Sequence, residues 1–332
     1  MYREMLLAWD GDEVRAGLLL HHGTLWLRGE ERPFCWLGLP VSEGLIDRRH
    51  TMAIVHLVSS VLAREPLLMD LGIGSLDETI AQFLMQLGWR YATVPFMFHP
   101  VRARRVLLGL SYLRSKPRLN LALRLAAYSG STAILDGGLA LLRRAQRARL
   151  RGYDLCREPS FGAWADHIYA QARTDYGAAV VRDAASLNIC YPPGDQRYLR
   201  LRVRSAQGHE LGWVVVIHAQ MREQKYFGNL HVGTLVDGFG AVPAVPVLVH
   251  AGLQWLVDAG VDLVVANLSH KRWREAARMC GFLPGPSNYF FFVSPEGNTL
   301  LQPGCSISEI HLTRGDGDGP FSLMPEPTTA LS

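Results

Sequence analysis

Hydrophobic and polar positions along the chain form two arrays of the same plan. Each array begins with apolar or alternating stretches typical of β-strands, continues with an amphipathic helix pattern, and ends with a strand, a short helix and a further strand segment. The first array closes with "REPLLMDLGIG", "SLDETIAQFLMQLGW" and "RYATVPFMFHPV", and the second with "VDLVVANL", "SHKRWREAARMCGF" and "PSNYFFFV". This order predicts an α/β (α+β) fold in which helices cover mixed sheets.

The two arrays predict two structural units joined by a connector. A chain of 332 residues with 48% hydrophobic content is long enough for two cores. In the first unit the opening strands are expected at "VRAGLLLHHG", "TLWLRG" and "PFCWLGLPV", and "RYATVPFMFHPV" is expected to supply a final strand pair. We place the first unit at 1–101, the connector at 102–152, the second unit at 153–312, and an Asp/Gly turn with a flexible tail at 313–332.

The connector is strongly basic. Residues 101–151 contain twelve lysines and arginines and a single acid, Asp136, although the whole chain carries a net charge of only +4. Leucines and alanines at helical spacing predict a pair of amphipathic helices, broken at "SGST" and "GG". Such a segment is either a solvated helical face or a patch that binds an anionic partner: a membrane surface, an acidic glycan or RNA.

Several classes of protein are disfavoured by what the sequence lacks. The start "MYREMLLAWDGDE" has no signal-peptide pattern, and no uncharged apolar run reaches the roughly 18 to 20 residues of a membrane span. We therefore expect a cytoplasmic protein with no transmembrane segment. The cysteines lie far apart, with no CxxC and no metal-ligand spacing, so the sequence predicts reduced thiols and no metal.

The ends of the two short helices carry a resemblance to a known family. Each helix follows a core strand and stops at a glycine and an aromatic residue, at Gly88–Trp89 and Gly281–Phe282. This pattern resembles the closing part of the GNAT acyltransferase fold, and two such units in one chain resemble the FemABX-like and tandem GNAT transferases. The resemblance implies that acyl-coenzyme A lies between two diverging central strands, with its pyrophosphate at the N-terminus of the next helix.

The phosphate loop of the family reads [QR]-x-x-G-x-[GA], and each unit matches it in part. In "RRHTMA" the first and last positions fit, but a threonine stands where glycine is expected; in "DGFGAV" only the glycine fits, and two prolines follow. The residues that the resemblance suggests for cofactor binding are Arg48, Arg49, Thr51, Ala53, Gly238 and Gly240. The two arginines favour the first unit for an anion.

The resemblance also suggests where the acceptor and the catalytic groups lie. The segment "SFGAWADHIYAQARTDYGAAVVRDAASLNICYP" looks like the two opening helices that shape the family's acceptor pocket, and only the second unit has it. The tyrosine that many relatives carry on the last helix is replaced by Leu84 and Ala277. Attack by a neutral amine needs a base, and His231 and Asp237 are the candidates. No cysteine has a histidine partner by sequence, so we expect direct transfer in a ternary complex.

Three functions remain open at this point. The first is transfer of an acyl group from acetyl-CoA or another acyl-CoA to an amine or hydroxyl, on a small molecule or on a glycan or cell-envelope precursor. The second is FemABX-like aminoacyl transfer from charged tRNA, which the basic connector favours. The third is a catalytically degenerate tandem module that only binds a partner, since neither phosphate loop is intact. Asp316 and Asp318 in "TRGDGDGP" are expected to form a surface turn that could line a site.

Overall fold

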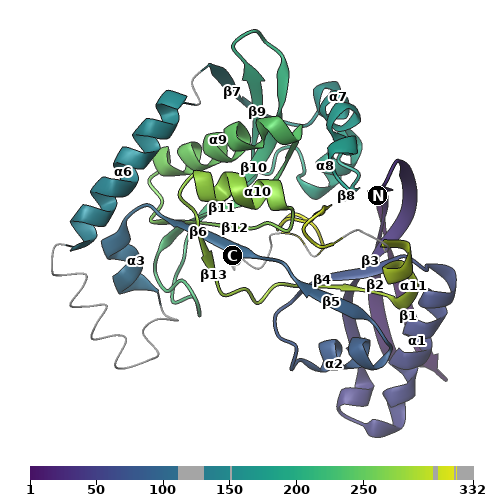
Figure 1. Cartoon of the computed structure of the whole chain (residues 1–332). Helices are drawn as coiled ribbons and strands as arrows, with labels where there is room; N and C mark the ends of the chain where they lie inside the picture. The colour runs from purple at the N-terminus through teal and green to yellow at the C-terminus, as the bar shows by residue number, and fades with distance from the viewer. Residues whose placement is uncertain (111–130, 150–151, 302–305, 318, 320–332) are drawn as a thin grey trace.

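The chain folds around two mixed sheets that lie side by side (Figure 1). The computed structural model describes residues 1–110, 131–149, 152–301, 306–317 and 319. The α/β prediction with mixed sheets is confirmed. Among the helices of these ranges, none combines the length and the apolar character needed to cross a membrane.

The first sheet contains most strands of the N-terminal part of the chain. Its order is β15-β8-β2-β3-β4-β14-β5, and β1 pairs with β2 as a branch. Helices α1 (Thr51–Arg64) and α2 (Thr79–Gln86) cover one face, where leucines and valines of the helices pack on the strands. The strands are β1 (Tyr2–Asp10), β2 (Glu13–Leu27), β3 (Glu30–Ser42), β4 (Leu68–Ile73), β5 (Arg90–Thr93), β8 (Ala178–Val180), β14 (Phe290–Val293) and β15 (Ile310–His311).

The second sheet has the order β13-β6-β12-β11-β10-β9-β7. Helices α7 (Ala163–Ala172) and α9 (Val245–Asp258) pack on its central strands, and α10 (Lys271–Met279) packs beside α9. The strands are β6 (Phe96–Pro100), β7 (Tyr153–Glu158), β9 (Leu199–Ser205), β10 (Glu210–Gln220), β11 (His231–Gly240), β12 (Leu263–Asn267) and β13 (Leu283–Gly285). The remaining helices are α3 (Ala103–Gly109), α6 (Ser131–Arg149), α8 (Ala184–Cys190) and α11 (Pro295–Leu301), with short 3-10 turns at Glu43–Leu45, Arg48–His50, Arg173–Asp175 and Val242–Ala244.

The two sheets exchange strands. Strand β6 comes from the first half of the chain but pairs with β12 of the second sheet, where His99 lies opposite Val264. In return, β14 from the second half lies between β4 and β5, with Phe292 opposite Asp70. The predicted final strand pair of the first unit is therefore wrong, because β5 and β6 belong to different sheets. The unit boundaries stay a prediction, and each sheet needs a strand from the other half of the chain.

Three local expectations also need correction. The stretches "VRAGLLLHHG" and "TLWLRG" form one 15-residue strand, β2, which passes through Gly23 without a turn. A Cβ at Gly23 would lie 2.9 Å from the Phe34 ring, so this glycine is required by packing. Strands β1 and β7, which precede the predicted strands of each unit, were not expected. Helix α6 continues through Gly137 and Gly138, where a break was predicted, and the predicted helix at "LNLALRLAAY" lies outside the described residues.

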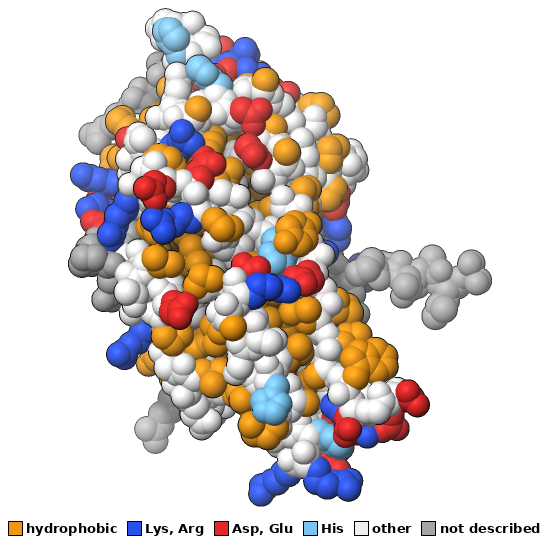
Figure 2. Space-filling model, turned by 90° about the vertical axis from the view of Figure 1, so that its right-hand side faces the viewer, with side chains coloured by type: hydrophobic (Ala, Val, Ile, Leu, Met, Phe, Trp, Pro, Cys, Tyr) orange, Lys and Arg blue, Asp and Glu red, His pale blue; other side chains and the backbone are white. Residues whose placement is uncertain are grey.

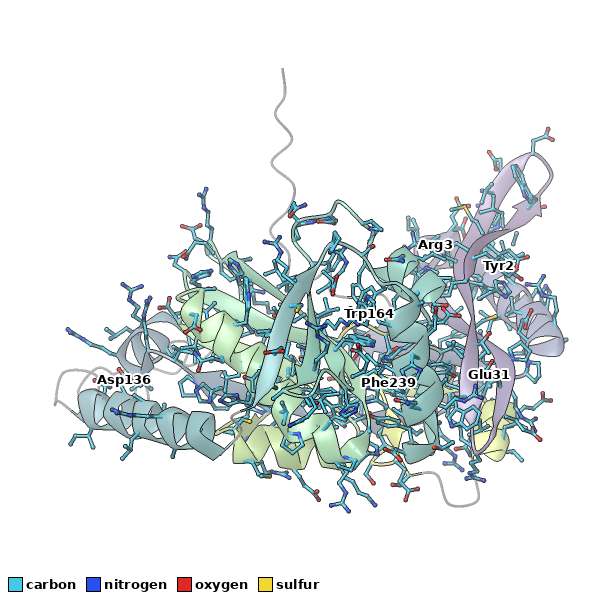
Figure 3. All side chains as sticks on the ribbon, turned by 90° about the horizontal axis from the view of Figure 1, so that it is seen from above. Tyr2, Arg3, Glu31, Asp136, Trp164 and Phe239 are labelled. Carbon is cyan, nitrogen blue, oxygen red and sulfur yellow. The ribbon has the colours of Figure 1, made fainter. Side chains whose placement is uncertain are left out.

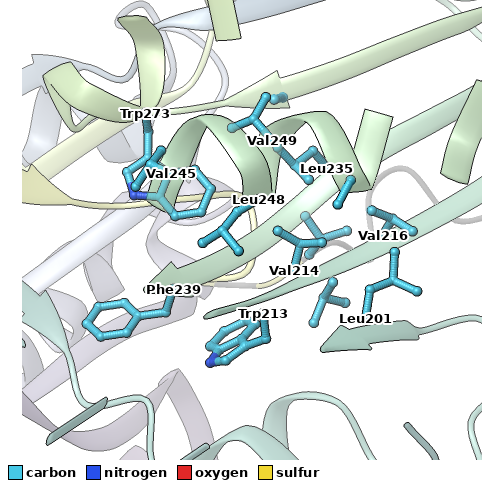
Figure 4. Packing of buried hydrophobic residues seen from close by; sticks show 14 of the residues in the cluster. Leu201, Trp213, Val214, Val216, Leu235, Phe239, Val245, Leu248, Val249 and Trp273 are labelled. Atoms are coloured by element: carbon cyan, nitrogen blue, oxygen red, sulfur yellow. The ribbon is translucent and has the colours of Figure 1, made fainter. Parts of the chain in front are cut away.

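The largest core lies in the second sheet. Trp213 and Phe239 are fully buried beside Leu248 of α9 (Figure 4). Helix α9 approaches the strands closely at Gly252, where a Cβ would lie 2.8 Å from Leu235 Cδ1. Burying an aromatic side chain of this size contributes about 1.5–3 kcal/mol. This core holds strand β11 rigidly, and β11 carries Asp237 into the candidate site.

Candidate functional site

In both sheets two parallel central strands separate after a short paired stretch. Strands β11 and β12 pair from Val232 with Leu263 to Leu235 with Ala266, and β11 then continues to Gly240. Strands β3 and β4 pair only at Cys35 with Leu68 and at Trp36 with Met69, and β3 then continues to Ser42. Each separation leaves backbone groups of one strand without their neighbour, so each is a place where a ligand or another chain segment can bind.

The gap in the second sheet is filled by the chain itself. Gly315 N donates a hydrogen bond to the Val236 carbonyl at 3.1 Å, and His311 Nε2 lies 2.8 Å from the Gly238 carbonyl. Leu268 and Thr313 form an antiparallel bridge on the other side of the gap. Residues 310–316 thus take up the backbone groups that a bound cofactor would need.

The glycines predicted to bind phosphate in this unit are tightly packed. A Cβ on Gly238 would lie 2.6 Å from Trp273 Cη2, and one on Gly240 would lie 2.4 Å from the Leu211 carbonyl oxygen. Close packing is therefore a sufficient reason for both glycines. Their phosphate role stays a prediction.

The gap in the first sheet has a different surface. Leu39 and Val41, on β3 beyond the paired residues, are 69% and 62% exposed, whereas Val236 and Phe239 on β11 are 0% exposed. Within the described residues, this part of β3 pairs only with β2. Figure 2, a view from the right-hand side of Figure 1, shows hydrophobic side chains at the surface between charged groups. Exposed apolar side chains therefore lie where β3 has lost its pairing with β4, and a ligand could bind there.

The loop between β3 and α1 places the predicted arginines at the start of that helix. Two guanidinium nitrogens of Arg49 donate to Asp47 Oδ2, and the Arg49 side chain is 84% exposed. Thr51 Oγ1 donates to the Arg48 carbonyl. A Cβ on Gly44 would lie 2.6 Å from Thr51 Cα, so the loop packs directly against the helix start. Helix α1 has no side-chain cap of its own because it continues the 3-10 turn Arg48–His50. Asp47 caps that turn by accepting from Arg49 N, and Thr51 N donates to the Arg48 carbonyl.

A basic depression lies beside this helix start. It has a volume of about 460 Å³, and its wall contains two of the predicted residues, Arg49 and Ala53. Arg15, His50 and His56 add further nitrogen groups, and Asp10 is the acid in the wall. Arg15 already pairs with Glu13 and Glu43, and Arg49 with Asp47, so an anionic ligand would bind here by replacing these carboxylates.

A larger cavity lies between the two sheets. It has a volume of about 550 Å³ and is lined by residues of β1, β2, β8, α8 and β11 and by Gly315, Asp316, Gly317 and Gly319. Tyr2 and Arg3, labelled in Figure 3, form part of the wall contributed by β1. Residues from both ends of the chain meet here, so only the folded chain forms this cavity.

Asp237, predicted as a catalytic base, lies in the cavity wall but is held by many hydrogen bonds. Its carboxylate accepts bonds from Arg182, from Tyr191 Oη at 3.1 Å and from Thr313 Oγ1 at 2.9 Å. Gly238 N also donates to it, at 2.8 Å. Since its oxygens are occupied, the geometry gives Asp237 a positioning role, and its role as base stays a prediction.

Asp316, also in the cavity wall, differs from Asp237 in its hydrogen bonding to the described residues. Its Oδ2 accepts from Arg182 Nη2 and from Thr313 N, each at 2.8 Å, whereas Oδ1 has no hydrogen-bond partner among the described residues. Burial raises the pKa of Asp316 to about 6, against the lowering effect of the Arg182 charge. The sequence placed Asp316 only in a surface turn that could line a site, because nothing local shows that the "GDGDG" stretch is buried.

His231, the other predicted base, lies elsewhere. It begins β11, and Asp237 follows six positions later, so extended geometry separates them by roughly 20 Å. His231 Nε2 lies 3.0 Å from His218 Nδ1 at the surface. The fold does not bring the two predicted catalytic residues together.

The basic connector lies away from the cavity. Asp136 on α6 accepts a hydrogen bond from Ala103 N at 2.6 Å, which ties α6 to the start of α3. In Figure 3, Asp136 lies at the opposite end of the molecule from Tyr2 and Arg3. Many of the predicted basic residues, including Arg114, Lys116 and Arg118, lie outside the described ranges, and binding of RNA or an anionic surface stays a prediction.

Solved structures show which fold this arrangement represents. The chain is similar to Saccharomyces cerevisiae N-myristoyltransferase with bound myristoyl-CoA, at 10% identity, TM-score 0.51, 85% of this chain and 67% of that one. It is also similar to a probable N-acyltransferase from Enterococcus faecalis V583, at 10% identity and a TM-score of 0.54, over 90% of this chain and 64% of that one. A GCN5-related N-acetyltransferase from Kribbella flavida matches at 13% identity and a TM-score of 0.52, over 90% of this chain and 64% of that one.

These likenesses identify the class of fold. The chain has a GNAT-like acyltransferase fold, as predicted, and it spans about two thirds of the length of these structures. No protein-family model and no curated protein matches the sequence. The function that the fold serves in this chain is therefore argued from the site.

Proposed function

We propose that the chain is an acyltransferase that binds an acyl-CoA in the first unit and transfers its acyl group directly to an acceptor in the central cavity. The observation that carries this proposal is the difference between the two strand gaps. Residues 310–316 occupy the gap of the second sheet, while the apolar edge of β3 is exposed at the gap of the first. The bound myristoyl-CoA of the yeast neighbour supports a thioester donor for this fold.

Charge supports this position for the acyl donor. The depression around Arg15 and Arg49 lies at the positive end of α1, where the phosphates of coenzyme A would be favoured. Arg48, Thr51 and Ala53 lie on the same turn. The threonine in place of the family's glycine donates its hydroxyl hydrogen to the Arg48 carbonyl within this turn.

The acceptor is placed at the cavity wall formed by Arg182, Tyr191 and Asp316. In the proposed reaction, an uncharged amine or a hydroxyl attacks the thioester carbonyl and forms the new bond to carbon. The carbon–sulfur bond breaks, coenzyme A leaves as the thiolate and takes a proton from solvent, and Asp316 Oδ1 accepts the proton of the acceptor. Asp237 holds Tyr191 and Arg182 in place for this step.

The test is isothermal titration of the full chain with acetyl-CoA and a long-chain acyl-CoA, with free adenosine as the ligand without the phosphate chain. We expect binding of both thioesters and about tenfold weaker binding in Arg49→Ala. Arg272→Ala is the matched control, because Arg272 is an exposed arginine on α10 that pairs only with Glu275 within the described residues. No binding at millimolar thioester, or an equal loss in the Arg272 variant, would contradict the placement of the acyl donor.

A further inference from the structure

Three elements of the first unit bring a histidine, a cysteine and a glutamate together. His22 lies on β2, Cys35 on β3, and Glu65 directly follows α1. His22 Nδ1 lies 3.1 Å from Cys35 Sγ and 3.9 Å from Glu65 Oε1. The imidazole nitrogen, the sulfur and the carboxylate oxygen all lie within 4.8 Å of one another.

These separations match those of zinc ligands. Bonds of about 2.3 Å to sulfur and about 2.1 Å to nitrogen or oxygen, at tetrahedral angles, place neighbouring ligand atoms roughly 3.4–3.6 Å apart. The observed 3.1 Å and 3.9 Å lie on either side of this range, and Cys35 Sγ and Glu65 Oε1 lie within 4.8 Å of each other. The side chains of Cys35 and Glu65 would draw together around a bound ion. Thiolate, imidazole and carboxylate are also the ligand types that zinc uses in proteins.

The other ring nitrogen of His22 is oriented as in metal-bound histidines. His22 Nε2 lies 2.8 Å from Glu4 Oε2, and the carboxylate of Glu4 is held in turn by Arg64. A proton on Nε2 leaves Nδ1 with a lone pair directed at Cys35 and Glu65. Carboxylates that accept from a ligating histidine in this way fix its tautomer and raise its basicity as a ligand. Tyr2 stacks on the ring, with centroids 4.2 Å apart, and limits its rotation.

We propose that His22, Cys35 and Glu65 bind a zinc ion. The carboxylates of Glu4 and Glu65 and a thiolate on Cys35 would carry three negative charges, against one positive charge on Arg64 and two on the ion. Zinc binding therefore neutralises the cluster. Three protein ligands leave a fourth position for water, and His22 lines the central cavity, which gives the cluster access to solvent.

The same cluster is poorly suited to nucleophilic catalysis by the cysteine. Cys35 is 0% exposed, and burial raises the pKa of its thiol to about 12. The ion would link β2, β3 and the end of α1 next to the point where β3 and β4 separate. The zinc inference does not depend on the proposal that the acyl donor binds in that gap.

The test is spectroscopic titration of the full chain with Co²⁺ after removal of bound metal with a chelator. We expect one Co²⁺ per chain, with thiolate-to-cobalt charge-transfer absorption and displacement by stoichiometric Zn²⁺. Cys35→Ser should abolish the charge-transfer absorption. Cys280→Ser, which removes another buried thiol from the second unit, should leave it unchanged.

A second variant keeps the test independent of folding defects at the buried cysteine. Glu65 has a side chain 22% exposed, so Glu65→Gln should preserve the fold, measured by its circular dichroism, while weakening Co²⁺ binding by about 10–100-fold. The proposal is overturned if the unaltered chain shows no thiolate-to-cobalt absorption, or if that absorption persists in Cys35→Ser. Either result would leave the cluster as a hydrogen-bonded network only.

Discussion

Gly315 N donates a hydrogen bond to the carbonyl of Val236 at 3.1 Å, and this contact joins the C-terminal part of the chain to the middle of strand β11. In a GNAT-like fold, this position lies on the strand that borders the acyl-donor gap. Because the chain's own backbone occupies it in the second sheet, the acyl donor is proposed to bind in the first. The same segment carries Asp316 into the central cavity, so one element both fills a gap and supplies a candidate base.

Gly315→Ala tests how closely this segment is packed. A Cβ at Gly315 would lie 1.9 Å from Tyr191 Oη and 3.1 Å from Asp237 Cβ, so the substitution must displace buried groups. We expect the free energy of unfolding to fall by about 1–3 kcal/mol, measured by denaturant titration. Gly137→Ala is the control, because a Cβ there meets nothing within 4 Å and lies inside α6; it should be neutral or stabilising by about 1 kcal/mol.

Asp316→Asn tests the proposed base. Since the pKa of Asp316 is raised to about 6, the base is ionised above that pH and protonated below it, so acyl transfer should rise with pH through about 6. The substitution should lower kcat by about 100-fold or more, with little change in thioester binding. Asp12→Asn, at an exposed turn, is the matched control. A pH profile that is unchanged in Asp316→Asn would exclude the role.

Buried histidines predict a loss of stability in acid. Burial, reinforced by Lys271 and Arg272, lowers the pKa of His270 to about 4, and burial also lowers the pKa of His311. The unfolded chain therefore binds more protons, and stability falls as the pH drops from about 6.5 towards 4. For His270 alone the loss is about 2 kcal/mol at pH 5.

Unfolding in urea at pH 7.5 and at pH 5 measures this loss. His270→Gln should reduce the difference in the free energy of unfolding between pH 7.5 and pH 5. His209→Gln, at an exposed turn between β9 and β10, should leave that difference unchanged. Equal stability of the unaltered chain at both pH values would contradict the expectation.

The exchange of β6 and β14 predicts that the two sheets unfold together. Met97 on β6 is 0% exposed in the second sheet, although the preceding strand, β5, belongs to the first. Met97→Ala should lower stability by about 2–5 kcal/mol and shift a single calorimetric transition rather than split it. Leu141→Ala is the control for shortening a large apolar side chain, because Leu141 on α6 is 69% exposed. Two separate transitions in the unaltered chain would show that the sheets are independent.

The sequence by itself determined the local elements and their order. The alternation that predicts β9, the continuous apolar run that predicts β10 and the amphipathic patterns of α1 and α9 all extend over a few neighbouring residues, so the sequence shows them directly. The Gly–aromatic ends of the short helices are equally local. The repeated order of these elements was sufficient to indicate a GNAT-like α/β fold. Arg49 and Ala53 were also placed together, because neighbours on one helical turn are neighbours in sequence.

Only the tertiary structure decided which distant segments meet. Strand exchange, the filled gap at Val236 and the cavity position of Asp316 all depend on pairing between residues far apart in the chain, and such pairing has no local period. For the same reason the spacing of cysteines and histidines gave no sign of the cluster at Cys35. The pleat of paired strands sets His22 directly opposite Cys35, and the end of α1 brings Glu65 to the same face.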